Sequence, residues 1–349
     1  MVDRKTKIVE VGKVRIGGGS PVSVQSMTNT DTRNVEQTAA QIKRLCDAGC
    51  EIIRLAIPDD EAAEAFRTIK KMVDVTLVAD IHFDYRLAIK AIENGADKIR
   101  INPGNIGSIE RVKQVVEKAK ERKIPIRIGV NSGSLEKEIL EKYGGVNVDG
   151  LVESAVRNVR IVEDLGYDNI VVSIKASDVM NTINSYREVS KKINYPLHVG
   201  VTEAGTVFSG TVRSSIGIGA LLAEGIGDTI RVSLTADPVV EVKTGIEILK
   251  SLGLRKQGIH LVSCPTCGRC RVNLVEIATN IENILINSEK NIKIAVMGCA
   301  VNGPGEARDA DIGVACGDSC GLIFKKGEVI RKVPEDKIIE ELMKEIMNL

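Results

Sequence analysis

Three cysteines lie within seven residues of one another, in the sequence CPTCGRC. Cys264 and Cys267 form a CxxC pair, and Cys270 follows three residues later. A CxxC pair can hold zinc, form a redox dithiol or supply half of an iron–sulfur site. Cys299 stands alone in MGCAVNGPGE, and such a Gly- and Pro-rich loop suits backbone wrapping around an inorganic cluster. The asymmetric spacing favours iron–sulfur, with zinc and unliganded thiols as the alternatives. Cys316 and Cys320 are expected to be core thiols.

A second group of residues with chemical potential consists of cations inside predicted strands. Barrel strands normally carry bulky apolar residues there. This chain carries Arg54, Arg100, Arg127 and Arg231 there, and Lys175 directly follows the run 168–174. Because side chains alternate along a strand, residues two or four positions apart share a face, which groups several of these cations with polar residues and also groups other polar residues with each other. The groups are Asp80 with His82, Arg100 with Asn102, Arg127 with Gly129 and Asn131, Ser173 with Lys175, His198 with Thr202, and Arg231 with Ser233.

These cations predict a phosphate-binding mouth. Any single arginine could be a solvated or paired structural charge, but cations at equivalent places in five of the units need a polyanion to offset their burial. Guanidinium groups match phosphate oxygens in a bidentate way, so a small ligand with two phosphates is expected. The segments TEAGTVFSG and SLTADP fit the phosphate-binding loops of a barrel. The chain has no GxxxxGK[ST], and GIGIGALLAEG lacks the third glycine of GxGxxG, so ATP or NAD held in the usual ways is not expected.

The elements that must position these residues follow a strand–helix alternation. Short β-branched runs occur at 21–27, 51–57, 75–81, 97–102, 124–130, 168–174, 195–201 and 227–234. Amphipathic helical runs separate them, for example 35–49 and 106–123. Eight such units in about 250 residues predict a (β/α)₈ TIM barrel, an α/β fold. The opening KIVEVGKVRIGG predicts a hairpin that caps the N-terminal end of the barrel.

A second, smaller domain is expected after the barrel. The stretch 251–260 predicts a linker, so the barrel domain spans 1–252 and an α+β iron–sulfur domain spans 259–349. The second domain is expected to contain a helix at 273–286, a strand at 292–298, a hairpin at 321–333 and a final helix from Glu335. A packed core role is expected for His260.

Bulk composition narrows the class of protein. The chain has 349 residues, 43% hydrophobic and 27% charged, with 48 basic and 47 acidic side chains and a net charge of +1. This balance, with 3% aromatic residues, argues against nucleic acid as a partner. No apolar run approaches the roughly 18 residues of a membrane helix, and the start lacks the apolar region of a signal peptide. A cytoplasmic protein with reduced thiols is expected.

Several motifs occur together in one order. They are QSMTNTDT, LVADIHF, KIRINPGN, RIGVNSGS, SIKASD, VTEAG, IRVSLTADP, CPTCGR and GCAVNGPGE. In this combination the chain strongly resembles the 4-hydroxy-3-methylbut-2-enyl diphosphate synthases of the methylerythritol phosphate route to isoprenoids. The resemblance covers essentially the whole chain and corresponds to the short, two-domain bacterial form.

The resemblance implies a reaction and a cofactor. In this family a [4Fe–4S] cluster reduces 2-C-methyl-D-erythritol 2,4-cyclodiphosphate, the ring opens, and a hydroxyl leaves as water. By motif, the cluster ligands would be Cys264, Cys267, Cys299 and Glu306. An oxygen ligand at one iron can give way to a substrate oxygen. Cys270 is not required by the family motif, although C-x₂-C-x₂-C could itself supply a third ligand.

The resemblance also implies roles at the mouth. The diphosphate contacts would be Arg54, Arg100, Arg127, Lys175 and Arg231, with hydrogen bonds from His82, Asn131 and Ser233. Glu203 would lie near the leaving hydroxyl as a proton donor or a positioning group, and Asn302 would touch the substrate beside the cluster. Asp80 and His198 could serve only to orient their neighbours, and Gln25 or Met27 could be barrel packing.

The partners implied are an electron donor and a second subunit. Ferredoxin and flavodoxin both fit as the donor. Family members form a head-to-tail homodimer in which each cluster domain caps the barrel of the other subunit, and this arrangement is expected here. One alternative is a pterin-binding barrel of dihydropteroate synthase or methyl-transfer type with an accessory metal module, which leaves the cysteines unexplained. Another is a zinc module that binds nucleic acid, which the charge balance disfavours.

Overall fold

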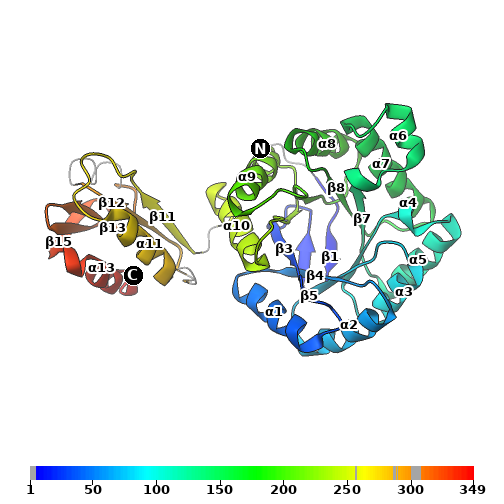
Figure 1. Ribbon diagram of the computed structural model, residues 1–349, viewed down its shortest axis with the longest axis horizontal. Helices are drawn as coiled ribbons and strands as arrows, with labels where there is room; N and C mark the ends of the chain where they lie inside the picture. Colours follow the sequence, from blue (N-terminus) through cyan, green and yellow to red (C-terminus); the bar gives the residue numbers. More distant parts are fainter. Residues whose placement is uncertain (1–4, 256–257, 286–287, 289, 300–307) are drawn as a thin grey trace. The chain divides into compact units, whose positions relative to one another are not determined.

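The structure is a computed structural model that describes residues 5–255, 258–285, 288, 290–299 and 308–349. It divides into two compact units, Met1–Arg255 and Lys256–Leu349 (Figure 1). Each unit has a sheet and a hydrophobic core of its own, so each is described by itself.

The first unit is built on eight parallel strands, which confirms the predicted TIM barrel. The strands are β3 (Ser23–Met27), β4 (Ile52–Ala56), β5 (Thr76–Asp80), β6 (Lys98–Ile101), β7 (Ile126–Asn131), β8 (Ile170–Lys175), β9 (His198–Val199) and β10 (Thr229–Ile230). Their order is β8-β7-β6-β5-β4-β3-β10-β9. A parallel bridge between Val172 and Leu197 brings β8 beside β9 and closes the ring.

Helices surround the strands, as the outer ring in Figure 1 shows. They are α1 (Val35–Asp47), α2 (Asp60–Met72), α3 (Tyr85–Glu93), α4 (Pro103–Ile106), α5 (Ile109–Arg122), α6 (Lys137–Tyr143), α7 (Val148–Asp164), α8 (Val179–Lys192), α9 (Val207–Ala223) and α10 (Pro238–Ser251), with a 3₁₀ turn at Ser132–Ser134. Polar caps begin several of them: Asp59 accepts a hydrogen bond from the N–H of Ala62, and Asp178 accepts one from Asn181. The caps fix where each strand-to-helix loop ends, and those loops line the mouth.

One predicted helix is wrong in its extent. The run 106–123 has a single helical period in the sequence, but the chain breaks at Gly107, which has a positive φ of 109°. Ser108 then caps α5 by accepting a hydrogen bond from the N–H of Arg111. As a result Ile106 is buried at the end of α4, whereas Ile109 is 66% exposed at the start of α5.

A hairpin closes the N-terminal end of the barrel. Strands β1 (Val9–Val11) and β2 (Val14–Ile16) pair antiparallel, as the opening sequence predicts. Their buried residues Val9, Val11 and Ile16 form one cluster with Ile52, Val78 and Val171 from three barrel strands. The cluster excludes water from this end and leaves the carboxyl ends of the strands as the open face.

The second unit is a five-stranded sheet with helices packed on one face. The strands are β11 (Ile259–Ser263), β12 (Ile292–Met297), β13 (Ile312–Gly317), β14 (Cys320–Lys325) and β15 (Glu328–Pro334), in that order across the sheet. The first three run parallel and the last two pair antiparallel. The helices α11 (Leu274–Leu285) and α13 (Ile338–Met347), the second preceded by a 3₁₀ turn at Glu335–Lys337, share one core with the sheet.

Within the part of the chain that the structure describes, no helix is both long enough and apolar enough to cross a membrane.

Candidate active site at the barrel mouth

The strand cations converge at the carboxyl ends of the barrel strands. Although they are charged, Arg127 is 1% exposed, Lys175 and Arg100 are 6% exposed, and Arg54 is 8% exposed. They line a cavity of about 100 Å³. Its lining consists of Arg54, Asp80, His82, Arg100, Arg127, Asn131, Ser173, Lys175, Thr202 and Arg231. Each period-two group expected from the sequence therefore contributes at least one residue to a common interior, although Asn102, Gly129, His198 and Ser233 are not among the lining residues.

A single carboxylate, Asp80, bridges two of these cations. Its oxygens lie 3.5 Å from Nε of Arg54 and 3.4 Å from Nη1 of Arg100. Burial would raise the pKa of the Asp80 carboxyl, but the guanidinium groups of Arg54, Arg100 and Arg127 lower it to about 2. Asp80 is therefore ionised at any ordinary pH and holds two arginines at the rim of the cavity.

Other groups orient the remaining guanidiniums. The Oε2 atom of Glu241, on α10, lies 3.5 Å from Nη2 of Arg231. Arg54 donates hydrogen bonds to the sulfur of Met27, from Nη2 at 2.9 Å and from Nε at 3.2 Å. Arg127 donates from Nη1 to Oγ of Ser173 at 3.2 Å. The arginines are thus held by neighbours before any ligand arrives, which lowers the entropy cost of binding.

Several donors at the mouth have no partner. Among the described residues, Nε of Arg100, Nε and Nη2 of Arg127 and Nε of Arg231 are buried without a hydrogen bond. Burial, together with Arg231 and Arg54, also holds the pKa of Lys175 well below its ordinary range. Buried donors without acceptors are costly. Oxygen atoms of an anionic ligand would satisfy them.

Asn131 and Gly129 complete the wall formed by β7. In the amide orientation that satisfies both of its polar atoms, Asn131 accepts a hydrogen bond from Nη2 of Arg100 at 2.8 Å. Gly129 provides space for the same arginine, because a Cβ atom at this position would lie 2.6 Å from Nε of Arg100. The glycine is required here for the packing of a neighbouring side chain.

Glu203 and Ser233 follow β9 and β10 at the same end of the barrel. Glu203 is exposed and has a φ of 52°, in the left-handed region that non-glycine residues rarely adopt. Such strain is often found at functional positions. Among the described residues, neither side chain belongs to the lining of the cavity. Both residues follow their strands in the chain rather than lie within them.

The cysteines gather at one end of the second sheet. Cys264 follows β11 and Cys299 follows β12, and these strands pair in parallel with Ser263 opposite Val296. The N–H of Gly298 donates to Sγ of Cys264 at 3.2 Å. A donor of this kind stabilises a thiolate ligand of an iron–sulfur site. Cys267 lies between Cys264 and Cys299 in the sequence, and its side chain is exposed. The donor set and the backbone N–H fit a cluster.

The ligand set cannot be completed from the described residues. Asn302 and Glu306 lie outside them, and within them no three His, Cys, Asp or Glu side chains converge as a metal site would require. Cys270 donates its S–H to the carbonyl of Val272 at 3.3 Å and is half-buried. Cys316 lies in the core of the unit, where burial raises its thiol pKa to about 12.

Comparison with known proteins places both units in one family. A model described as the GcpE TIM-barrel domain matches residues 6–246, and one described as the GcpE protein C-terminal domain matches residues 260–348. The chain belongs to the GcpE family. Among its relatives is a protein of Ruminiclostridium cellulolyticum that is 63% identical over 99% of this chain and 98% of its own length. Another, from Clostridium tetani, is 60% identical over all of both chains. Each is named 4-hydroxy-3-methylbut-2-en-1-yl diphosphate synthase (flavodoxin), so the family resemblance stated from the sequence is confirmed.

The barrel of this GcpE family member also resembles dihydropteroate synthases in fold. The enzyme of Stenotrophomonas maltophilia has a TM-score of 0.52 and 11% sequence identity, over 71% of this chain and 97% of its own. A Yersinia pestis enzyme has a TM-score of 0.51 and 13% identity, over 70% of this chain and 98% of its own. At this level of identity the likeness is one of fold alone, so it gives no support to the pterin-binding alternative.

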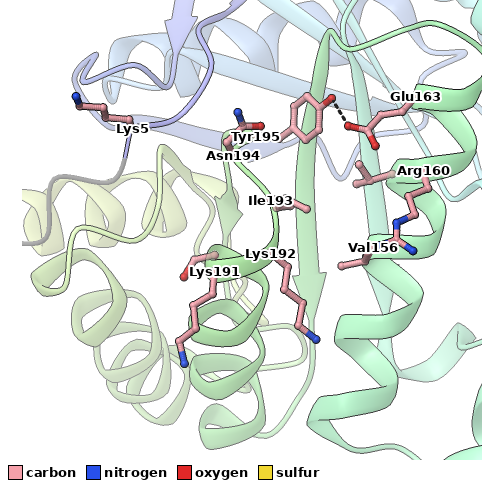
Figure 2. A pocket seen from close by; sticks show the side chains of 11 residues that line it. Lys5, Val156, Arg160, Glu163, Lys191, Lys192, Ile193, Asn194 and Tyr195 are labelled. Atoms are coloured by element: carbon pink, nitrogen blue, oxygen red, sulfur yellow. Dashed lines mark hydrogen bonds between the residues drawn. The ribbon is translucent and has the colours of Figure 1, made fainter.

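A larger cavity of this GcpE family member, about 420 Å³, lies at the other end of the barrel. It sits between the C-terminal halves of α7 and α8 and is lined by Arg160, Lys192 and Tyr195, whose hydroxyl donates to Glu163 at 2.7 Å (Figure 2). Barrel enzymes carry out their chemistry at the carboxyl ends of the strands. The smaller cavity at the mouth is therefore the candidate active site.

Sequence reasoning missed three residues of this site. Glu241 lies on a helix, where strand alternation gives no signal. Met27 appears as packing, and its contact with Arg54 depends on the neighbouring strand. Gly129 does share a face with Arg127, but its role follows from Arg100, on the adjacent strand β6.

Proposed function

We propose that this chain catalyses the reductive ring opening and dehydroxylation of 2-C-methyl-D-erythritol 2,4-cyclodiphosphate to 4-hydroxy-3-methylbut-2-enyl diphosphate. The observation that carries the proposal is the ring of buried, preoriented guanidinium groups at the mouth, several of whose N–H donors lack partners. The names of the close relatives, with which this chain shares about 60% of its residues over its full length, support the same reaction.

Binding of the cyclic diphosphate falls to the barrel domain, residues 1–252. Arg54, Arg100, Arg127, Lys175 and Arg231 contact the two phosphates, and His82, Asn131 and Ser233 add hydrogen bonds. Guanidinium forks fix the orientation of a phosphate as well as its position, so the carbon that loses its hydroxyl is presented in one direction. Asp80 keeps Arg54 and Arg100 apart and aimed, and it does not contact the ligand in this proposal.

The second domain, residues 259–349, holds a [4Fe–4S] cluster through Cys264, Cys267, Cys299 and Glu306. The N–H of Gly298, directed at Cys264, supports this assignment. When bound, the cluster would pass on, one at a time, the two electrons that the reduced donor protein supplies, and it would offer one iron whose oxygen ligand can exchange. Cys270, whose S–H is already used by the backbone, is a structural thiol.

The chain's own residues handle the proton and the charge. Glu203 at the rim donates or positions a proton at the leaving hydroxyl, which departs as water. Asn302 contacts the substrate beside the cluster. The cations at the mouth stabilise the negative charge that the product gains when the ring oxygen is released as a terminal phosphate.

Flavodoxin is the proposed electron donor, because the close relatives carry that word in their names; ferredoxin is the other candidate. The proposed location is the cytoplasm, where thiols remain reduced and available as ligands. The proposed assembly is a homodimer in which the cluster domain of each subunit serves the barrel of the other. Helix α10 runs toward the N-terminal end of the barrel, so the chain leaves the barrel at the end opposite the mouth, which supports this assembly.

Anaerobic turnover tests the proposal. The reconstituted protein, with reduced flavodoxin, should convert the cyclic diphosphate to the linear product. Arg127→Ala should lose at least about tenfold in substrate affinity, since a charged hydrogen bond contributes roughly 1.5–3 kcal/mol. The exposed Arg157→Ala is its control and should behave like wild type.

Iron and sulfide counts test the ligand set in the same preparations. Cys264→Ser should lose the cluster and Cys270→Ser should keep it. Loss of the cluster in Cys270→Ser would overturn the assignment, and zinc in place of iron would overturn the reaction.

A further inference from the structure

A layer of polar side chains lies inside the barrel, below the cationic mouth. Lys98 precedes Arg100 by two residues on β6, so both point to the inner face. His198, Thr229 and Ser23 are paired across the neighbouring strands β9, β10 and β3. Lys98, His198 and Thr229 are 0% exposed and Ser23 is 1% exposed.

This layer contains more polar atoms than partners. Among the residues that the structure describes, Nζ of Lys98, both ring nitrogens of His198 and both amide atoms of Gln25 lack a hydrogen bond. A buried ammonium without an acceptor is costly, because desolvation removes its water and nothing replaces it. A neutral amine or imidazole is less costly and can also accept a hydrogen bond from a guanidinium.

The charges that face Lys98 and His198 are mostly positive. Burial holds the pKa of Lys98 well below its ordinary range, and Arg127 and Arg54 add to this effect. Burial lowers the pKa of His198 as well, with Arg127, Lys175 and Lys98 adding to it. The charged or titratable groups around the pair are Arg54 on β4, Asp80 on β5, Arg100 on β6, Arg127 on β7, Lys175 on β8, Arg231 after β10, Tyr186 on α8 and Glu241 on α10.

We propose that Lys98 and His198 are both neutral in the free protein, and that the pair takes up a proton from solvent when a diphosphate binds at the mouth. The inference rests on the proposed function for the identity of the ligand. Two phosphates placed among the arginines reverse the sign of the local field, so the interior next to them becomes favourable for an ammonium or imidazolium. Lys98 and His198 are positioning residues here, since they act on the ligand through the arginines.

Lys175 is the competing proton acceptor. It lines the cavity, and its pKa is also held low by burial. Proton uptake by Lys175 is distinguished from uptake by the interior pair by comparing a variant at the mouth, Lys175→Met, with the interior variants Lys98→Met and His198→Gln.

Calorimetry of the oxidised protein without reductant measures the uptake. Binding of the cyclic diphosphate is titrated at pH 7.5 in buffers of different ionisation enthalpy, and the slope of the binding enthalpy against that quantity gives the protons taken up. Wild type should take up about one proton more than Lys98→Met, by linkage. His198→Gln should show a smaller loss of uptake. The exposed Lys113→Met is the control and should match wild type.

Two outcomes would count against the inference. If uptake is lost in Lys175→Met but unchanged in Lys98→Met and His198→Gln, the interior pair plays no part and the inference is wrong. If wild type binds with no proton uptake, it is also wrong, although the proposed function stands. A wild type that shows no binding heat contradicts the proposed function instead.

A ligand-free measurement then tests the protonation state by itself. Lys98 has an ordinary pKa of 10.5 when unfolded, so between its lowered native pKa and that value the unfolded chain binds more protons. The stability of wild type relative to Lys98→Met should therefore rise between pH 7 and 9.5 in denaturant titrations. A difference that does not change with pH means that Lys98 is charged in the native protein, and the inference fails.

Discussion

Asp80 decides where two of the phosphate-binding arginines point. It touches both Arg54 and Arg100, and both pairs are buried. A carboxylate in this place offsets the repulsion between two guanidiniums. Its own negative charge makes the mouth less attractive to an anion, so its contribution is to stability and geometry rather than to affinity.

Replacement of Asp80 should therefore affect folding strongly. Asp80→Asn keeps the shape and removes the charge, and it should lower the free energy of unfolding by about 3–5 kcal/mol, because two buried cations lose their counterion. Urea unfolding measures this. The half-buried Asp84→Asn is the control: asparagine also caps α3, and the pair with the exposed Arg86 contributes about 1 kcal/mol or less.

The difference in free energy of unfolding between wild type and Asp80→Asn should depend on pH in a characteristic way. The folded pKa of Asp80 is about 2, below its ordinary value of 3.8. Its stabilisation is therefore present above pH 3.8 and is lost as the pH falls through about 2. The difference between wild type and Asp80→Asn should stay constant from pH 8 to 5 and shrink below pH 4. A difference that changes near neutrality would mean that another group is responsible.

At the scale of elements, β6 and β7 bring two arginines of the mouth side by side. Arg100 and Arg127 are directly paired across these strands. Two guanidiniums side by side can both reach inward only because Gly129 leaves room for Arg100. The strand pair therefore depends on a position with no side chain.

Gly129→Ala should displace Arg100. Its Cβ atom would lie 2.6 Å from Nε of that residue. Overpacking of this kind costs about 1–3 kcal/mol of stability, and the affinity for the cyclic diphosphate should fall along with it. Gly133→Ala is the matched control, since an added Cβ there meets nothing within 4 Å. Equal affinities in the two variants would show that Arg100 does not depend on this space.

Much of the element arrangement could be predicted from the sequence. Six of the eight barrel strands lie within the predicted runs, because apolar alternation and turn residues are local signals, and β7 and β8 each extend one residue beyond theirs, to Asn131 and Lys175. The break at Gly107 could not be predicted from periodicity, since Ile106 and Ile109 fit one helical face. Strand β13 was not predicted, because its Gly- and Ala-rich sequence, IGVACG, gives only a weak strand signal. The role of Lys98 was also missed, although its spacing from Arg100 placed it on the inner face.

At the scale of the whole molecule, the barrel exposes apolar surface on one helix. Phe208 is 83% exposed on α9, with Val212 and Ile216, four and eight residues later, at 44% and 53%. This spacing forms a stripe along one helical face. Apolar stripes that water would otherwise cover often mark contacts between proteins, and this one supports the proposed homodimer.

Mixing two inactive variants tests whether the units work across subunits. Arg127→Ala disables the mouth and Cys264→Ser disables the cluster. If each cluster domain serves the partner's barrel, unfolding and refolding the two together should restore about a quarter of the wild-type activity, because half of the dimers are mixed and each has one complete site. Each variant refolded alone is the control. No recovery, with mixed dimers present in native mass spectrometry, would mean that each subunit works alone.

The hairpin formed by β1 and β2 affects how substrate, product and protons enter and leave the barrel. Among the described residues its cluster with Ile52, Val78 and Val171 closes one end, so substrate, product and protons are expected to share the opening at the carboxyl ends of the strands. A molecule bound at that opening therefore isolates the interior for as long as it stays. Any proton that Lys98 or His198 has taken up then stays in the interior until the molecule leaves. Protons therefore exchange between the interior and solvent at the rate of product release.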